Sequence, residues 1–241
     1  MKTLLCLPLL CLYLHAQARE TIRVGVELQP YLPYYEVQDG EYRGYARELL
    51  DAFAAERGYR FVYTALPVRR LDRDFLAGRV DLRYPDHPLW NAEEKAGHLI
   101  HYSQPTVPYL DGVLVKPAHL DQDSGRIRRL GTVNGFTPWP YLEDIRAGRT
   151  RLVQNSRIDY LLRMALADRV DAVYLSPRVA ARQLRQLGLP PNALVFDPQL
   201  AYVEDHYYLS SAGRPQLIAE FDRFLLEQAA QVEQIRQRYG L

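Results

Sequence analysis

Residues 76–84 read LAGRVDLRY, and residues 166–174 read LADRVDAVY. The two stretches agree at six of nine positions, in the pattern L-A-x-R-V-D-x-x-Y. Each follows apolar residues at helical spacing and leads into a β-rich run, which predicts a helix, a tight turn and a strand. A unit repeated about ninety residues apart is longer than a solenoid repeat and indicates two similar lobes. The alternative is chance similarity between two amphipathic helices.

The two tyrosines that end these stretches predict where a ligand would bind. Ligands of open α/β sheets lie at the carboxyl ends of the strands. Strands that end at Tyr84 and Tyr174 would therefore face a shared cleft between the lobes.

The first 18 residues have the pattern of a cleavable secretory signal. Lys2 supplies a positive charge, residues 4–14 form an apolar core too short to span a bilayer, and residues 16–18 (AQA) match a cleavage site. We therefore expect the mature chain to start at Arg19 and to be exported to the periplasm.

Composition excludes several classes of function. Both cysteines, Cys6 and Cys11, lie in the expected signal, so no disulfide framework is expected. Loss of Lys2 leaves 29 of 30 basic residues against 29 acidic ones, and this balance argues against nucleic acid as a partner. No later apolar run would cross a membrane, and no zinc spacing or G-x-S-x-G motif occurs. We expect a soluble monomer without metal, cofactor or catalysis.

Short motifs follow one another along the whole mature chain. They are Ile22-Arg23-Val24-Gly25-Val26, Pro33-Tyr34, Gly44-Tyr45 with Glu48-Leu49, Gly78-Arg79-Val80-Asp81-Leu82, Tyr102-Ser103 with Pro105, Gly112-Val113-Leu114-Val115 and Arg169-Val170-Asp171-Ala172-Val173. Each motif alone is weak. Their order and spacing resemble the type II periplasmic solute-binding proteins, specifically extracellular solute-binding family 3, which serves polar amino-acid ABC transporters.

The resemblance implies an α/β fold of two lobes, each a mixed sheet flanked by helices, with the ligand cleft between them. Lobe 1 is expected to comprise residues 19–115 and 206–241, and lobe 2 residues 116–205. No low-complexity linker separates them, so two backbone strands should join the lobes. Closure would then be a hinge motion near residues 115–117 and 203–206.

Both charge anchors of the family are missing from the sequence. Relatives follow the first Val-Asp strand with a Thr and then an Arg that clamps the ligand carboxylate, but Pro88 and Glu93 fall at these positions. Ser176 falls where relatives hold the ligand ammonium with an Asp. A carboxylate in place of a guanidinium would repel a carboxylate ligand. We expect the fold to carry over and ordinary α-amino acids to bind weakly.

The resemblance also implies three ligand contacts in the first lobe. Tyr31 (or Tyr34) and Tyr45 match aromatic residues that pack on the ligand in relatives, and Glu27 matches an acidic position that faces the cleft. The alternatives are core packing for the tyrosines and a surface carboxylate for Glu27.

Other candidates come from the residues themselves. Arg83 would lie inside a covered strand, where a charged residue is unusual, so it is either an anion contact or a structural partner of Asp86 or Glu93. The proline-rich turn after the strand should bring Asp86 and Trp90 to the cleft mouth, where an acid beside an indole suits a cation or a hydroxylated ring. Asn134 lies in a turn whose amides would bind an anion, or in an ordinary turn. The full set of expected ligand-binding residues is Glu27, Tyr31, Tyr45, Arg83, Tyr84, Asp86, Trp90, Asn134, Phe136, Tyr174 and Ser176.

The sequence therefore predicts a periplasmic solute-binding protein that captures a small polar ligand, with an inner-membrane ABC permease as its partner. Two alternatives stay open on the same fold. One is a ligand-sensing partner of a membrane signalling protein, and the other is a dehydratase-like enzyme.

Overall fold

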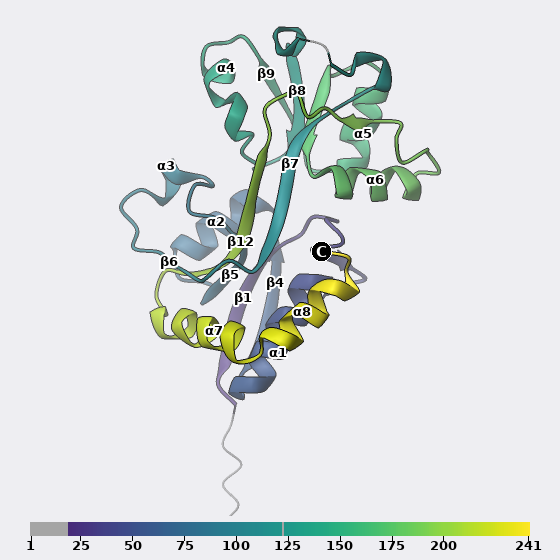
Figure 1. The fold of residues 1–241 in the computed structure, drawn as a ribbon. Coiled ribbons are helices and arrows are strands. Elements are labelled where there is room, and N and C mark those ends of the chain that lie inside the picture. The colour runs from purple at the N-terminus through teal and green to yellow at the C-terminus, as the bar shows by residue number, and fades with distance from the viewer. Residues whose placement is uncertain (1–18, 122) are drawn as a thin grey trace, which may run out of the picture.

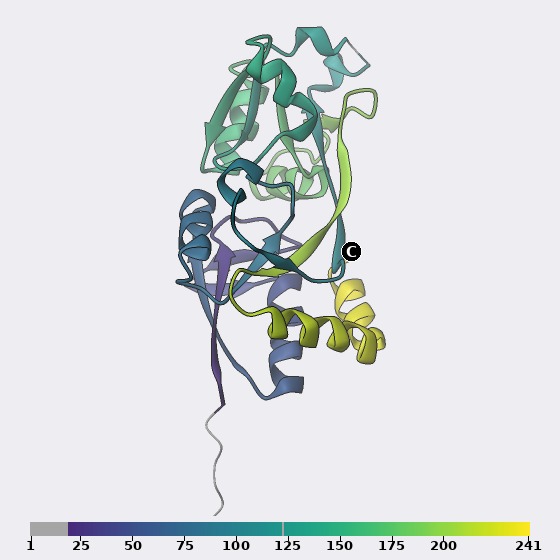
Figure 2. The ribbon, with the colours of Figure 1, turned by 90° about the vertical axis from the view of Figure 1, so that its left-hand side faces the viewer.

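The computed structural model describes residues 19–121 and 123–241, so the expected signal at residues 1–18 lies outside the described part. Two α/β lobes are stacked end to end and joined by two long strands, β7 (Val107–Val115) and β12 (Val203–Ser211) (Figure 1). In the side view these strands run along one edge of the molecule (Figure 2). A single path of strands continues from one lobe into the other, in the order β4-β1-β5-β12-β7-β10-β8-β9.

The first lobe is built on three parallel strands. They are β1 (Thr21–Glu27), β4 (Arg60–Leu66) and β5 (Leu82–Asp86). The end of β12 adds an antiparallel strand beside β5, and β6 (His101–Tyr102) pairs with β12 in turn.

Helices and one hairpin complete the first lobe. In α1 (Tyr45–Arg57), Leu49 and Phe53 are fully buried, and the helix ends at Gly58, whose left-handed φ of 73° suits a glycine. Phe53 packs against Phe221 at a ring distance of 5.1 Å, which ties α1 to the end of the chain. The remaining elements are β2 (Glu36–Gln38), β3 (Glu41–Arg43), α2 (Val68–Leu76), α3 (Ala92–Lys95), α7 (Pro215–Glu227) and α8 (Ala229–Arg238).

The second lobe repeats this arrangement around β8. Parallel neighbours flank β8, and the far half of β7 runs antiparallel to β10. Its strands and helices are β8 (Arg129–Val133), β9 (Arg151–Asn155), β10 (Ala172–Leu175), β11 (Val195–Phe196), α4 (Leu142–Arg146), α5 (Ile158–Leu166) and α6 (Pro177–Gln186). Single 3-10 turns occur at Pro117–His119, Ser124–Arg126 and Trp139–Tyr141.

The repeated sequence forms the same unit in both lobes, as expected. In the first lobe α2 leads through a turn into β5, and in the second α5 leads into β10. The backbone N–H and the guanidinium of Arg23 donate to Asp81, and those of Arg129 donate to Asp171 in the same way. The shared Asp therefore links each repeat to the neighbouring parallel strand.

The starts of α4 and α5 in the second lobe are irregular. The 3-10 turn Trp139–Tyr141 leads directly into the short α4. Asn155 and Ser156 have the residue types of a helix cap, but they do not cap α5, because the cap position is Arg157. Asn155 Oδ1 instead accepts a hydrogen bond from the Arg157 N–H and shapes the turn before the helix.

The two connecting strands pair with each other between the lobes. Residues 107–111 of β7 pair with residues 203–207 of β12. Beyond this ladder, Gly112–Leu114 pair with β10 of the second lobe. By this pairing, the chain first passes from one lobe to the other a few residues before residue 115. The lobe boundaries themselves stay a prediction. No helix of the described residues is long and apolar enough to cross a membrane.

Candidate functional site

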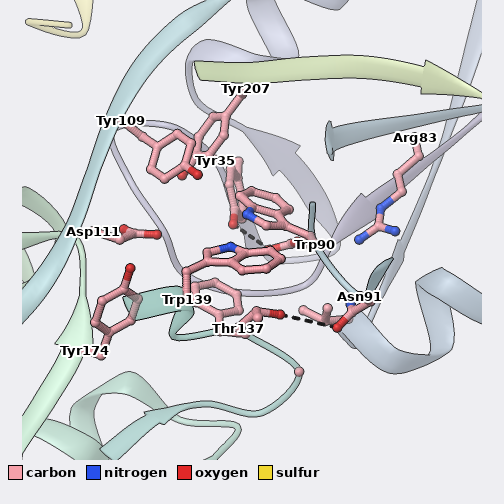
Figure 3. Close-up of a pocket in the computed structure, with 14 residues that line it drawn as sticks. Tyr35, Arg83, Trp90, Asn91, Tyr109, Asp111, Thr137, Trp139, Tyr174 and Tyr207 are labelled. Atoms are coloured by element: carbon pink, nitrogen blue, oxygen red, sulfur yellow. Dashed lines mark hydrogen bonds between the residues drawn. The ribbon is translucent and has the colours of Figure 1, made fainter. Parts of the chain in front are cut away.

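A cavity lies between the lobes, beside the ladder of the two connecting strands (Figure 3). In this conformation the space left in it for the centre of a water molecule is only about 20 Å³. Its lining residues come from both lobes and from β7 and β12. They are Glu27, Tyr35, Val68, Arg83, Trp90, Asn91, Tyr109, Asp111, Gly135, Phe136, Thr137, Trp139, Tyr174 and Tyr207.

The topology explains why these side chains meet. Glu27 ends β1, Trp90 follows β5, Phe136 follows β8 and Tyr174 lies in β10. All four strands are parallel members of their sheets, and their carboxyl ends face the opposite lobe, where ligands of such sheets bind.

Arg83 forms the cationic end of the cavity. The residue is fully buried, and its Nη1 donates to Asp72 and lies 3.7 Å from Asp86. Burial lowers the pKa of Arg83, but the carboxylates of Asp86, Asp72 and Glu27 raise it by more. The pKa therefore lies above its usual value, and the guanidinium stays charged. Its Nε and Nη2 are buried and have no hydrogen-bond partner among the described residues. One edge of the guanidinium is thus held by the protein, and the other edge is unpaired.

A second cation completes the buried charge cluster. Lys95 Nζ donates to Asp86 at 2.6 Å and to the His87 carbonyl at 2.8 Å, and Ser210 donates to the other oxygen of Asp86 at 2.6 Å. Arg83 and Lys95 face the carboxylates of Asp72 and Asp86, so two positive and two negative charges balance in this cluster.

Glu27 lies next to the cluster and is buried. Its carboxylate accepts a hydrogen bond from the Tyr35 hydroxyl at 2.5 Å. Burial raises the pKa of Glu27 to about 7, although the Tyr35 hydrogen bond and the charge of Arg83 lower it. Glu27 is therefore poised to change its charge near neutral pH.

Asp111 forms the other end of the cavity and also carries a buried carboxylate. Tyr31 donates a hydrogen bond to Asp111 at 3.0 Å, and the Tyr31 hydroxyl accepts one from the Ser176 N–H at 3.1 Å. Burial raises the pKa of Asp111 to about 7, while the Tyr31 hydrogen bond lowers it.

Aromatic rings form the wall between the two ends. Trp90 lies 5.8 Å from the ring of Tyr109 and 5.7 Å from that of Tyr207, and these two tyrosines stack at 4.7 Å. Trp139 approaches the same space from the second lobe (Figure 3). Ring faces of this kind suit apolar and cationic groups alike.

The lobes touch across the cavity, which defines a closed conformation. Thr137 donates to Asn91 at 3.4 Å. Gly135 has a φ of 94°, and a Cβ added there would lie 2.8 Å from the Cβ of Val68. Only a glycine at this position allows the turn after β8 to approach α2 so closely.

The structure brings five of the expected site residues to the cavity wall. These are Glu27, Arg83, Trp90, Phe136 and Tyr174. Whether they contact a ligand stays a prediction.

The other expected residues lie behind the wall. Tyr45 and Tyr84 are buried in the first lobe and bond to Thr106 at 3.2 and 2.8 Å. The Asn134 N–H donates to the Asn155 carbonyl, so this amide is used within the protein. Tyr31, Asp86 and Ser176 support lining residues through the contacts described above.

The two positions where relatives carry charge anchors are Glu93 and Ser176. Ser176 is buried, and its N–H donates to the Tyr31 hydroxyl. Glu93 is exposed on the outer rim and pairs with Arg146 at 3.2 Å, so its carboxylate does not face the cavity. Arg83 pairs with Asp72, a partner that the sequence did not indicate, and weakly with Asp86, which was one of the expected partners.

Sequence reasoning missed several lining residues, notably Asp111, Tyr109 and Tyr207 on the connecting strands. Asp111 precedes Gly112, and this pair suggested the start of a strand rather than its interior. The structure shows why a glycine occurs inside β7: a Cβ at Gly112 would lie 2.4 Å from the ring of Phe196. An acid in an otherwise apolar strand was the signal that could have found the site.

Comparison with known proteins defines the class of fold. No family model matches the sequence, and no curated protein matches it. Among solved structures, a histidine kinase sensor domain with similarity to periplasmic binding proteins superimposes with a TM-score of 0.75 and 20% identity, over 92% of this chain and 96% of that one. The arginine-, lysine-, histidine-binding protein ArtJ from Geobacillus stearothermophilus gives a TM-score of 0.73 and 18% identity, over 92% and 95%.

An ancestral arginine-binding protein bound to arginine is similar to the same degree, with a TM-score of 0.72, 18% identity and coverage of 92% and 99%. The chain therefore has the periplasmic-binding-protein fold. The expected fold is confirmed. At these identities the likeness concerns the fold alone.

Proposed function

We propose that the protein is a periplasmic solute-binding protein that captures a small carboxylate-bearing ligand between its lobes for an inner-membrane ABC importer. The observation that carries the proposal is the unpaired edge of Arg83 at the cavity. Buried polar groups in native proteins have partners with few exceptions, and an unpaired buried donor costs about 1–3 kcal/mol. A ligand group that accepts both N–H bonds would remove this cost.

A carboxylate fits this edge better than other acceptors. Nε and Nη2 lie side by side on the guanidinium, and two parallel N–H donors match the two oxygens of a carboxylate. Because Asp72 holds the opposite nitrogen, the guanidinium is fixed in position before the ligand arrives. Arg83 would thus take over the role that the resemblance assigned to the position of Glu93.

Closure would take place in the ladder between the lobes. Residues 107–111 and 203–207 form the whole strand connection, so small backbone rotations there would open the cavity. Small-angle scattering should show a smaller radius of gyration at saturating ligand than without ligand. An unchanged radius together with proven binding would contradict the hinge motion.

The anchor is tested by Arg83→Lys. Lysine keeps the charge that Asp72 and Asp86 require but lacks the fork, so we expect the affinity to fall about tenfold to hundredfold while the protein stays folded. Arg146→Lys, on the outer rim, is the matched control and should bind as the wild type does. Equal affinity of Arg83→Lys and wild type, measured by calorimetry, would exclude Arg83 as the anchor.

The ligand is found by a thermal-shift screen, since a ligand that binds the native state raises the melting temperature. We expect ordinary α-amino acids such as glutamine, arginine and glutamate to give small shifts, because the ammonium anchor of relatives is replaced by Ser176. Micromolar binding of several of them in calorimetry would refute this.

Two other functions remain alternatives. The likeness to a histidine kinase sensor domain favours a sensing role, which would appear as ligand-dependent binding to a membrane kinase in place of solute uptake. An ancestral amino-acid-binding protein described as a precursor of cyclohexadienyl dehydratase shares the fold, with a TM-score of 0.68 and 17% identity. Turnover of a bound ligand, followed by mass spectrometry, would favour the enzyme.

A further inference from the structure

The end of the cavity opposite Arg83 has a chemistry of its own. Asp111 is more than nine-tenths buried and lines the cavity. Tyr31 donates a hydrogen bond to Asp111, and among the described residues no Lys, Arg or His forms an ion pair with it. Its charge acts instead on a group of tyrosines that surround it: Tyr31, Tyr34, Tyr109, Tyr174 and Tyr207.

Asp111 is far from the cationic end. Strand β12 lies between β7 and β5. Asp111 of β7 lies opposite Val203 of β12, and Arg83 of β5 lies opposite Ser210 of β12. The two positions on β12 are seven residues apart, with an irregularity between Tyr208 and Ser210. The side chains of Arg83 and Asp111 reach into the same cavity from these two places and so shorten the gap between their charges. Figure 3 shows Asp111 and Arg83 at opposite sides of the cavity, with Trp90 and Trp139 between them.

Resting on the proposed function, we propose that Asp111 and the rings around it bind an ammonium group, so that the ligand is an extended zwitterion with its carboxylate on Arg83. A buried carboxylate without a cationic partner is stabilised by an incoming cation. Aromatic faces add cation–π attraction, which favours amines and alkylated ammonium groups.

The separation excludes a simple α-amino acid as the molecule that meets both ends. In an α-amino acid one carbon joins the ammonium and the carboxylate, so the ammonium would stay beside Arg83. An ω-amino acid, or a betaine with a long chain, places the two charges several bonds apart and fills the aromatic middle with methylene groups.

The test uses calorimetry on the mature chain with a series of probes: glycine, β-alanine, 4-aminobutyrate and 6-aminohexanoate, and hexanoate as the probe without an amine. We expect affinity to rise along the amine series, with 6-aminohexanoate at least tenfold tighter than glycine. Asp111→Asn should weaken 6-aminohexanoate at least tenfold and leave hexanoate unchanged. The amide oxygen can still accept the Tyr31 hydrogen bond, and circular dichroism melts check that the variant folds.

Each outcome decides one of the two ideas. Equal binding of 6-aminohexanoate to wild type and Asp111→Asn would overturn the ammonium site while leaving the anchor at Arg83 intact. Tighter binding of glycine than of the longer probes would do the same. If no carboxylate probe binds, or if Arg83→Lys leaves the affinity for the probes unchanged, the proposed function fails and this inference fails with it.

Discussion

The hydroxyl of Tyr31 donates to Asp111 at 3.0 Å, and the same oxygen accepts the Ser176 N–H at 3.1 Å. Tyr31 belongs to the first lobe, Asp111 to a connecting strand, and Ser176 to the start of α6 in the second lobe. One side chain therefore joins all three parts of the molecule in the closed conformation.

We expect Tyr31→Phe to disfavour closure. Without the hydroxyl, the buried N–H of Ser176 and the carboxylate of Asp111 lose their partner, at a cost of about 1–3 kcal/mol. Ligand affinity should fall by a corresponding factor of about ten or more, measured by calorimetry. Tyr42→Phe is the matched control, because the buried Tyr42 hydroxyl has no partner in the described part of the chain. Equal affinities of the two variants would contradict the role of Tyr31.

Gly135→Ala tests the close approach of the lobes. The added Cβ would collide with Val68 across the cavity, so the second lobe could not reach its closed position. Any residue other than glycine is also strained at this positive φ, and Gly148→Ala controls for that strain. Gly148 has a φ of 72° in the same lobe with no atom within 4 Å of the added Cβ. We expect both variants to lose similar stability and only Gly135→Ala to lose ligand affinity.

In the closed conformation, the titration of Glu27 and Asp111 should lower the stability as pH rises from about 4 to about 7. Burial raises the pKa of both Glu27 and Asp111 to about 7, above the values near 4 of unfolded carboxyls. Between these values the native state binds more protons than the unfolded state, so the free energy of unfolding decreases with pH. The groups that face Glu27 are Tyr35, Arg83, Asp72 and Asp86, and Tyr31 bonds to Asp111.

Urea denaturation at pH 5, 6, 7 and 8 measures this dependence. In the double variant Glu27→Gln with Asp111→Asn, neither site titrates. The free energy of unfolding should then decrease less steeply with pH. A double variant with the same pH dependence as the wild type would show that other groups cause it.

The sequence predicted the repeated unit and the polarity of the strands, because helix-turn-strand segments are encoded locally. Arg83 was recognisable for a similar reason: a charge in a covered strand requires a partner, and this requirement is visible in one short segment. Its nearer partner, Asp72, lies on the preceding helix, and only tertiary packing brings the two together.

The residues that sequence reasoning missed depend on the relative position of the lobes. Tyr109, Asp111 and Tyr207 lie on the two connecting strands and face the cavity only because β7 and β12 pair between the lobes. Trp139 comes from a turn of the second lobe, and its place opposite Trp90 follows from closure. No local pattern contains this information.

The last prediction concerns these two tryptophans, which line the cavity from opposite lobes. In Trp139→Phe the emission reports on Trp90, and in Trp90→Phe it reports on Trp139. We expect both emissions to shift when 6-aminohexanoate or another bound ligand closes the cavity. A ligand that binds without moving either emission would show that the rings do not face it.

Trp90→Ala separates a binding role from a packing role. Loss of a ring that contacts the ligand should weaken binding by about 1–3 kcal/mol. Trp90 also packs against Tyr109 and Tyr207, and loss of a core aromatic lowers stability by about 3–5 kcal/mol. Because Trp90 is only partly buried, we expect the stability loss to stay below this range and the affinity loss to be clear. A large fall in melting temperature with unchanged affinity of the folded fraction would assign Trp90 to the core of the first lobe.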